Sequence, residues 1–229
     1  MILNIETTAD VCSVSLSEGN EVKALKESAE GHNHATMLTV CAGELLSGAG
    51  LAVTDLEAVS VSMGPGSYTG LRIGVSTAKG LCYGAGVPLV AVPTAEVLVQ
   101  AFLAAHAGDI GPEWRLMPMI DARRMEVYTA MYDAAGAPCS EVHAEIVTAD
   151  SFRGELSAGP VAFFGPGAMK CADTVRSDNA RFFGGIRASA AAMAALSARE
   201  VRERRWRDVA YFTPFYLKEF MATTPRKKW

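Results

Sequence analysis

Apolar and small polar residues alternate along residues 58–63, which is the period-two pattern of a β-strand. A glycine-rich corner, residues 64–74, follows this strand and leads into a helical pattern over residues 70–83. Glycine lets the backbone adopt positive φ or approach another surface closely, and Ser67 and Thr69 are residue types that cap helices. The pattern therefore predicts a strand, a tight corner and a helix.

The same order of elements occurs twice along the chain. Strand-like residues 2–5 end near Glu6 and are followed by a second strand-like run; residues 116–120 end at Asp121 and are followed in the same way. Helical patterns then cover residues 34–47, 70–83 and 94–107 in the first half, and 168–176 and 189–205 in the second. We predict an α/β fold of two tandem duplicated halves, residues 1–107 and 108–229, joined at a Gly- and Pro-containing segment.

Two such halves facing each other across a cleft describe the actin-like ATPase (ASKHA) architecture, with ribonuclease H-like subdomains. In that architecture the hairpin tips bind phosphate and Mg²⁺. The candidate nucleotide-binding residues are therefore the hydroxyls and carboxylates at the strand ends, Glu6, Thr7, Thr8 and Asp121. The same residue types also form ordinary turns, so both interpretations stay open at this stage.

Composition narrows the class of protein. The chain has 229 residues, half of them apolar, and a net charge of −4, which suits a globular protein with a sizeable core. The N-terminus lacks the basic segment of a secretory signal, and the longest uncharged stretch in the middle of the chain falls short of the about 20 residues of a membrane helix. We expect a cytoplasmic protein that does not interact with membranes.

Cysteine and histidine give no sign of a metal site. Five cysteines lie far apart without a Cys-x-x-Cys pair, and we expect them to be reduced. His32 and His34 are close in sequence but have no further ligands at fixed spacing. The glycine corner itself lacks the Lys-Ser/Thr pair of a P-loop, the third glycine of a dinucleotide fingerprint and the glycines of a nucleophile elbow. We therefore expect neither a metal nor another cofactor.

Several segments together resemble the TsaB (YeaZ) family, the partner subunits in bacterial synthesis of threonylcarbamoyladenosine on tRNA. They are residues 5–8 with 12–16, the glycine corner 64–74, residues 88–92, 121–124 with 126–128, and 214–217. The likeness runs from Met1 to about Lys218. It implies a protein that binds the catalytic paralogue TsaD and the ATPase TsaE, forms a homodimer when alone, and meets tRNA only through the complex.

The resemblance also implies that this chain is not itself an enzyme. TsaD holds a metal with His-x-x-x-His just after the strand that corresponds to residues 88–92. Here residues 93–99 contain no histidine, and a single carboxylate, Glu96, is a poor transition-metal site.

Two helices are the expected partner surface in proteins of this kind. The helix over residues 34–47 has Leu38, Cys41 and Leu45 on one apolar stripe, and Met37 and Val40 extend the apolar surface beyond it, which indicates a second buried face. The expected partner contacts of this helix are Met37, Val40, Cys41 and Leu45. The next helix carries small residues along two ridges, Gly70, Gly74 and Ala78 on one and Gly80 and Gly84 on the other, and this spacing would let a partner backbone approach closely. Packing of this helix on its own sheet also favours small side chains, so that alternative stays open.

Other functions remain as alternatives. An ATP-binding or ATP-hydrolysing actin-like enzyme would use Glu6 and Asp121 across the cleft. A metallopeptidase, suggested by the old "glycoprotease" label of relatives, conflicts with the missing histidine pair. The arginines between residues 199 and 207 are typical of a solvated helix face, with RNA contact as the lesser alternative.

Overall fold

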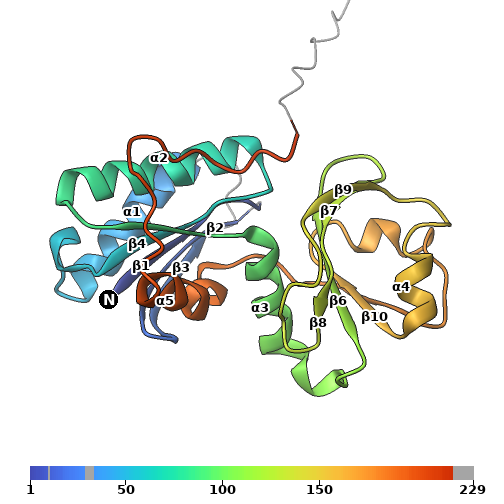
Figure 1. Cartoon of the computed structure of the whole chain (residues 1–229). Coiled ribbons are helices and arrows are strands. Elements are labelled where there is room, and N and C mark those ends of the chain that lie inside the picture. The colour runs from blue at the N-terminus through green and yellow to red at the C-terminus, as the bar shows by residue number, and fades with distance from the viewer. Residues whose placement is uncertain (10, 29–33, 219–229) are drawn as a thin grey trace, which may run out of the picture.

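The computed structural model describes residues 1–9, 11–28 and 34–218, which form two lobes, each with its own sheet (Figure 1). The first sheet has the order β3-β2-β1-β4-β5. Its strands are β1 (Ile2–Glu6), β2 (Cys12–Glu18), β3 (Glu21–Ser28), β4 (Ala58–Ser62) and β5 (Leu89–Val92). β1 pairs antiparallel with β2 and β2 with β3, whereas β1, β4 and β5 run parallel.

The second sheet repeats this topology. Its order is β11-β10-β6-β7-β9, and the short β8 (Tyr132–Asp133) also pairs with β6. The strands are β6 (Arg115–Asp121), β7 (Glu126–Thr129), β9 (His143–Ile146), β10 (Val161–Phe164) and β11 (Ala180–Phe183). Counted from the first strand of each half, both main sheets have the order 3-2-1-4-5 with the same strand directions. The predicted tandem duplication is confirmed.

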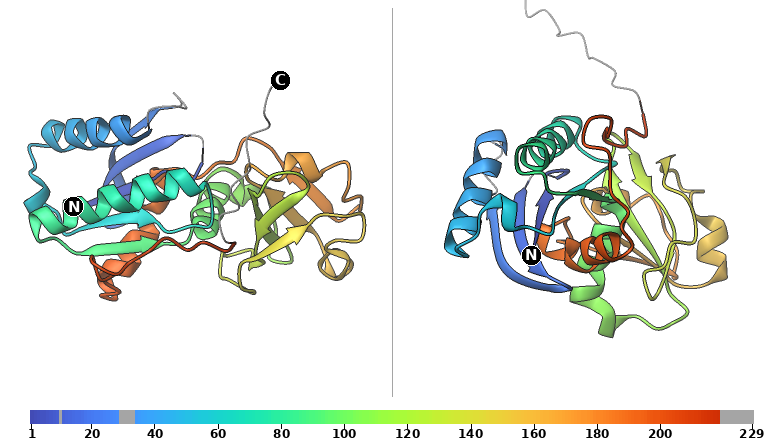
Figure 2. Two further views of the ribbon diagram at one scale, coloured as in Figure 1. Left: turned by 90° about the horizontal axis from the view of Figure 1, so that it is seen from above. Right: turned by 60° about the vertical axis from the view of Figure 1, so that its left-hand side comes forward.

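Helices cover both faces of the first sheet (Figure 2). α1 (His34–Gly48) and α2 (Tyr68–Ala85) pack on one face, and α5 (Ala194–Arg202) packs on the other together with a 3₁₀ turn, η4 (Ala190–Met193). α3 (Thr94–His106) packs on β6. Short elements complete the chain: η1 (Val53–Asp55), η2 (Ala107–Asp109), α4 (Arg153–Ala158) and η3 (Met169–Cys171).

Two helices pack on the sheet of the half to which sequence did not assign them. α3 precedes the predicted boundary at residue 107 yet contributes Phe102 to the core of the second sheet, and α5 lies beyond that boundary yet packs on β1 and β5. Each sheet is thus built from the strands of one predicted half, but α3 of the first half packs on the second sheet and α5 of the second half packs on the first sheet. The division at residue 107 into two units stays a prediction.

The two faces of the first sheet differ in chemistry because β1, β2 and β4 alternate apolar and polar residues. Leu3 and Ile5 join the apolar core beneath α1 and α2. The opposite face, toward η4 and α5, carries a buried polar group, Asn4, Glu6, Ser13, Ser15, Ser17, Ser60 and Ser62, beside a small apolar cluster of Ile2, Ala58 and Val90 with Val201 of α5. Ser197 of α5 donates a hydrogen bond to Ser60 (2.7 Å), and Ser15 donates to the carbonyl of Ala190 (2.8 Å). We call this polar surface the serine face.

Two predicted helices are wrong in extent. Residues 168–176 form only η3 and short turns, and Gly167 joins them to β6 by donating its amide hydrogen to the Met119 carbonyl (2.8 Å). Residues 189–205 divide into η4 and α5, and α5 ends before Arg204, which has a left-handed φ of 54°. None of the described helices combines the length and apolar composition needed to cross a bilayer.

Candidate functional site

The glycine corner packs against the turn between β1 and β2, within the chain itself. The amide of Ser67 donates to the Thr8 carbonyl (3.0 Å), and Thr7 Oγ1 donates to the Gly70 carbonyl (2.7 Å). A β-carbon at Gly66 would lie 2.7 Å from Thr8 Cβ, and one at Gly70 would overlap the Thr7 carbonyl oxygen. Ser67 also caps α2 by accepting from the amide of Gly70 (3.2 Å). The close backbone approach inferred from the glycines is therefore an internal one.

Glu6 ends β1 beneath this corner and is fully buried. Its Oε1 accepts from the amide and the hydroxyl of Thr8, each at 2.5 Å, and its Oε2 accepts from the Ser62 hydroxyl. Burial raises the pKa of the Glu6 carboxyl above its ordinary value, and the hydrogen bonds from Ser62 and Thr8 offset part of this rise. The buried Glu6 carboxyl thus stabilises the turn between β1 and β2 through hydrogen bonds.

We expect Glu6→Gln to flatten part of the dependence of stability on pH. Because the folded pKa is raised, the folded state retains the Glu6 proton above pH 4.5, so the free energy of unfolding falls as pH rises from there through the folded pKa. A glutamine can accept from Thr8 without ionising. Urea unfolding at about pH 4 and about pH 8 should show the variant gaining on the wild type at the higher pH.

The matched control for this experiment is Glu57→Gln, which changes an exposed carboxylate by the same chemistry. Wild-type and Glu6→Gln curves that stay parallel over this pH range would show that Glu6 has no raised pKa.

A cavity of about 580 Å³ opens between the lobes, beside the glycine corner. It is lined by the corner and the start of α2, by the turn between β6 and β7, and by Phe215–Lys218 of the C-terminal segment. Of the four predicted nucleotide-binding residues, Thr8 and Asp121 line this cavity. Glu6 and Thr7 lie buried behind its wall. The structure brings the two hairpin tips to one cavity, as the duplicated pattern implies.

The acidic groups at the cavity are already paired. Asp121 Oδ1 accepts from the amide of Arg123 (2.7 Å) and from Lys170 Nζ (2.6 Å). Glu126 of β7 forms an ion pair with Lys218. Sequence reasoning missed Lys170 and Lys218 as partners, since they lie 49 and 92 residues away along the chain. A carboxylate held by a lysine is less available to a cation.

The C-terminal segment contacts the end of β4 and the outer side of α2, next to the glycine corner. The amide of Phe215 donates to the Met63 carbonyl (2.7 Å), and the Tyr216 ring lies 5.0 Å from the ring of Tyr68 on α2. Lys79 donates to the carbonyls of Ala210 and Phe212, both at 3.0 Å. Residues 214–217 were among the motif segments of the resemblance, and the structure places them at the cavity.

Five of the seven predicted partner-surface residues lie inside the molecule. Cys41, Leu45 and Ala78 belong to the core beneath α1 and α2. Gly70 is buried against Thr7, and a β-carbon at Gly74 would overlap Thr7 Oγ1. For Gly70, Gly74 and Ala78 the structure shows internal packing, the alternative that the sequence left open. Cys41 and Leu45 are likewise packed internally.

The other two predicted partner-surface residues, Met37 and Val40, lie on the outward surface of α1. Val40 is 43% exposed and Met37 is half-buried on α1, while α2 presents Tyr83, which is 86% exposed. Gly80 and Gly84 of α2 are exposed, with nothing within 4 Å of where a β-carbon would stand. We call these five residues the α1–α2 face. Of the two predicted ridges of small residues on α2, the one with Gly80 and Gly84 is thus open to a partner, whereas the one with Gly70, Gly74 and Ala78 faces inward.

The start of α3 shows no metal-binding arrangement in the described chain. Thr94 is buried, and Glu96 forms an ion pair with Arg199 of α5 (2.7 Å). Among the described residues, no group of three or more His, Cys, Asp or Glu side chains is placed to hold an ion. His32 lies outside the described residues.

Comparison with known sequences gives related proteins. A family model described as TsaD, tRNA N6-adenosine threonylcarbamoyltransferase, matches residues 27–219. The tRNA threonylcarbamoyladenosine biosynthesis proteins TsaB of Escherichia coli (strain K12) and Bacillus subtilis (strain 168) are each 34% identical over 131 residues, 57% of this chain and 54% of theirs. The chain thus matches about half the length of these curated relatives.

Two solved structures share the fold. One is described as an uncharacterized protein with similarity to peptidase YEAZ from Pseudomonas aeruginosa, with a TM-score of 0.82 and 23% identity over 95% of this chain and 99% of that one. The other, YeaZ from Pseudomonas aeruginosa, has a TM-score of 0.79 and 23% identity over 94% and 99%. Together with the repeated sheet order, this likeness confirms the predicted actin-like fold class. The chain therefore belongs to the family of the tRNA N6-adenosine threonylcarbamoyltransferase TsaD, and its resemblance to the TsaB (YeaZ) group is confirmed.

Proposed function

We propose that this chain is a non-catalytic cytoplasmic subunit of the machinery that makes threonylcarbamoyladenosine on tRNA, and that it binds TsaD through the α1–α2 face. The curated relatives that it resembles are named for this biosynthesis. In the complex, which also includes the ATPase TsaE, the chain supports the active conformation of TsaD. Without TsaD, the same face pairs two copies of the chain.

The exposed apolar side chains of α1 and α2 are the observation that carries this proposal. Val40 is 43% exposed and stands one turn from Met37, and Tyr83 is 86% exposed on the neighbouring helix. Exposed apolar side chains on two adjacent helices favour burial against a partner, and the flexible side chain of methionine adapts to more than one partner surface. The glycines at 80 and 84 leave room for a close approach.

The pairing of the acidic groups supports a non-catalytic role. Glu6 is held by Thr8 and Ser62, Asp121 by Lys170, and Glu96 by Arg199. An ATP-hydrolysing enzyme that used Glu6 and Asp121 would have to break these contacts to bind Mg²⁺. Calorimetry with Mg-ATP tests this alternative, since tight binding abolished by Glu6→Ala and Asp121→Ala would favour it.

We expect Val40→Glu to weaken binding to TsaD at least tenfold, because a carboxylate would be buried without a partner in the interface. The measurements are calorimetric titration with TsaD and the rate of tRNA modification by the reconstituted complex. Ile146→Glu is the matched control, since Ile146 is 68% exposed on β9, in the other lobe. This control should bind TsaD as the wild type does.

Two results would reject the proposal. One is full-rate tRNA modification by TsaD and TsaE without this chain. The other is a Val40→Glu variant that binds TsaD with unchanged affinity.

A further inference from the structure

The turn between β6 and β7 holds two consecutive arginines in a left-handed conformation. Arg123 has φ 69° and Arg124 has φ 48°, and the turn is closed by hydrogen bonds from the Glu126 amide to the Arg123 carbonyl (3.0 Å) and from the Ala122 amide to the Glu126 carbonyl (3.1 Å). Tight hairpin turns with positive φ at both central residues favour asparagine and glycine. Arginine is an unfavourable residue for this backbone, so its side chain calls for a separate explanation.

Both side chains are exposed, and within the described part of the chain neither Arg123 nor Arg124 forms an ion pair. The nearby carboxylates are neutralised by other cations, Asp121 by Lys170 and Glu126 by Lys218. Among the described residues, the turn therefore presents two unpaired positive charges, and Arg123 lines the cavity.

Further cations and aromatic rings surround this mouth. The guanidinium of Arg72 lies 5.5 Å from the centre of the Tyr68 ring, and Tyr68 is paired with Tyr216. Arg123 and Lys218 line the cavity, Arg124 follows Arg123 in the turn, and Arg72 and Lys170 contact the lining residues Tyr68 and Asp121. We call Arg72, Arg123, Arg124, Lys170 and Lys218 the cationic rim. The described acidic residues that line the cavity are Asp121 and Glu126, so the described part of the rim is net positive in a chain whose net charge is −4.

Basic side chains next to partly exposed aromatic rings are the combination that binds RNA phosphates and bases. We propose that the cationic rim binds phosphates of the tRNA backbone in the complex with TsaD, an inference that rests on the function proposed above. Both arginines are exposed on a turn at the edge of the cavity, which suits a backbone passing over the mouth. A long polyanion can contact several rim cations at once, and each contact releases counterions.

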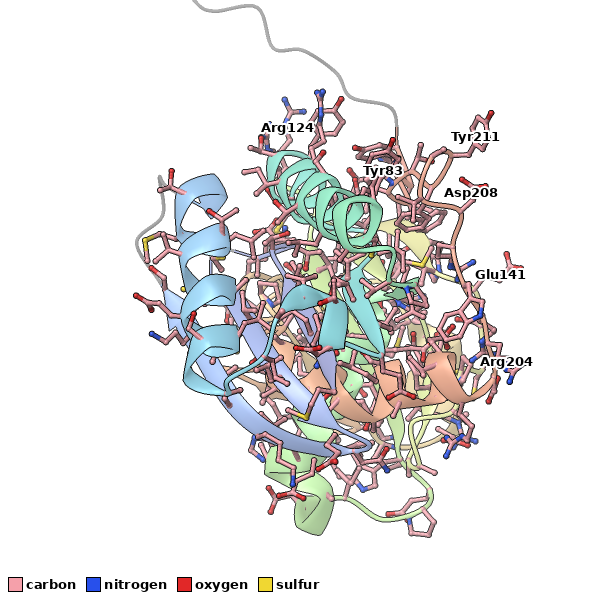
Figure 3. All side chains as sticks on the ribbon, turned by 90° about the vertical axis from the view of Figure 1, so that its left-hand side faces the viewer. Tyr83, Arg124, Glu141, Arg204, Asp208 and Tyr211 are labelled. Carbon is pink, nitrogen blue, oxygen red and sulfur yellow. The ribbon has the colours of Figure 1, made fainter. Side chains whose placement is uncertain are left out.

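The test replaces both arginines with residues that fit the backbone. Arg123→Gly/Arg124→Gly removes two charges and relieves the left-handed conformation. Arg204→Gly is the matched control, because Arg204 is also an exposed arginine at positive φ, 54°. Figure 3 shows Arg124 at the upper edge of the molecule and Arg204 at the lower right, well away from it.

Binding of an in vitro transcribed, unmodified tRNA is measured by fluorescence anisotropy, with each variant in complex with TsaD and at several salt concentrations. We expect the double variant to bind about tenfold more weakly at low salt, with a slope of log K against log salt that is smaller by about two. The Arg204→Gly complex should match the wild type. Thermal unfolding temperatures of both glycine variants should equal or exceed that of the wild-type chain.

An unchanged affinity and salt slope for the double variant, in a complex that still forms, would overturn this inference and leave the proposed function intact. A double variant that loses binding of free ATP but keeps its affinity for tRNA would also overturn it. If the double glycine variant unfolds at a lower temperature than the wild type, the variant Arg123→Lys/Arg124→Lys is measured instead. Because this variant keeps both charges, the inference requires it to keep the wild-type affinity for tRNA. A wild-type chain that fails to bind TsaD rejects the proposed function itself.

Discussion

Gly70→Ala is expected to destabilise the protein by about 3 kcal/mol. A methyl group at this position would overlap the carbonyl oxygen of Thr7. Thr7 cannot easily move away, because its own hydroxyl donates to the Gly70 carbonyl and the neighbouring Glu6 and Thr8 are hydrogen-bonded to each other. The overlap is therefore with backbone that is fixed from both sides. Urea unfolding followed by circular dichroism measures the change.

Gly80→Ala is the matched control on the same helix. A β-carbon at Gly80 would have nothing within 4 Å, so alanine should gain up to about 1 kcal/mol from its higher helix propensity. Opposite signs for the two substitutions are the expected result. If Gly70→Ala were as stable as the wild type, the glycine corner would not be closely packed on the β1–β2 turn.

Phe102→Ala is expected to cost about 4 kcal/mol. Phe102 of α3 is fully buried, stacks on Phe164 of β10 with ring centres 4.2 Å apart, and meets Phe183 of β11 edge-on at 5.0 Å. Its removal would leave a cavity where α3 meets the second sheet. Tyr83→Ala, which truncates an aromatic ring that is 86% exposed, should change the unfolding free energy by less than about 0.5 kcal/mol.

The Phe102→Ala substitution also tests the predicted division of the chain at residue 107. If α3 belongs energetically to the second lobe, Phe102→Ala should increase hydrogen exchange in β10 and β11 more than in β1 and β4. Equal changes in both sheets would mean that the lobes unfold as one unit. Larger changes in the first sheet would contradict the packing of Phe102.

The alternation of residue types was enough to predict β1, β2, β4, β6 and β7 and the duplication, whereas the short strands β9, β10 and β11 were not predicted. β1, β2, β4 and β6 each have a clear period or a fully apolar run, and the acidic residues at the ends of β1 and β6 marked the equivalent points. β3 was not predicted, because it is an edge strand whose outward residues are mostly charged and whose apolar side is half-exposed. Long, regular helices such as α2 were predicted nearly to their ends.

The direction in which a helix faces could not be predicted from spacing alone. Gly70, Gly74 and Ala78 do share a ridge, as predicted, but the ridge turns inward because Thr7 occupies the space above it. In the same way, the hairpin tips were predicted to meet, whereas the lysines that pair with the acidic groups were not. Contacts between residues more than 40 positions apart depend on the finished fold and leave no local pattern.

The serine face has a consequence for how the chain is made. α5 covers that face and is among the last elements to leave the ribosome, so the first sheet waits with one side uncovered while the second lobe is synthesised. The serines and Asn4 remain hydrated during that interval, so the apolar surface left uncovered by α5 is small, formed by Ile2, Ala58 and Val90. Leucine or valine in place of the serines would expose a larger apolar surface of the kind that favours aggregation. We therefore expect a nascent chain stopped before residue 190 to stay dispersed and not to aggregate.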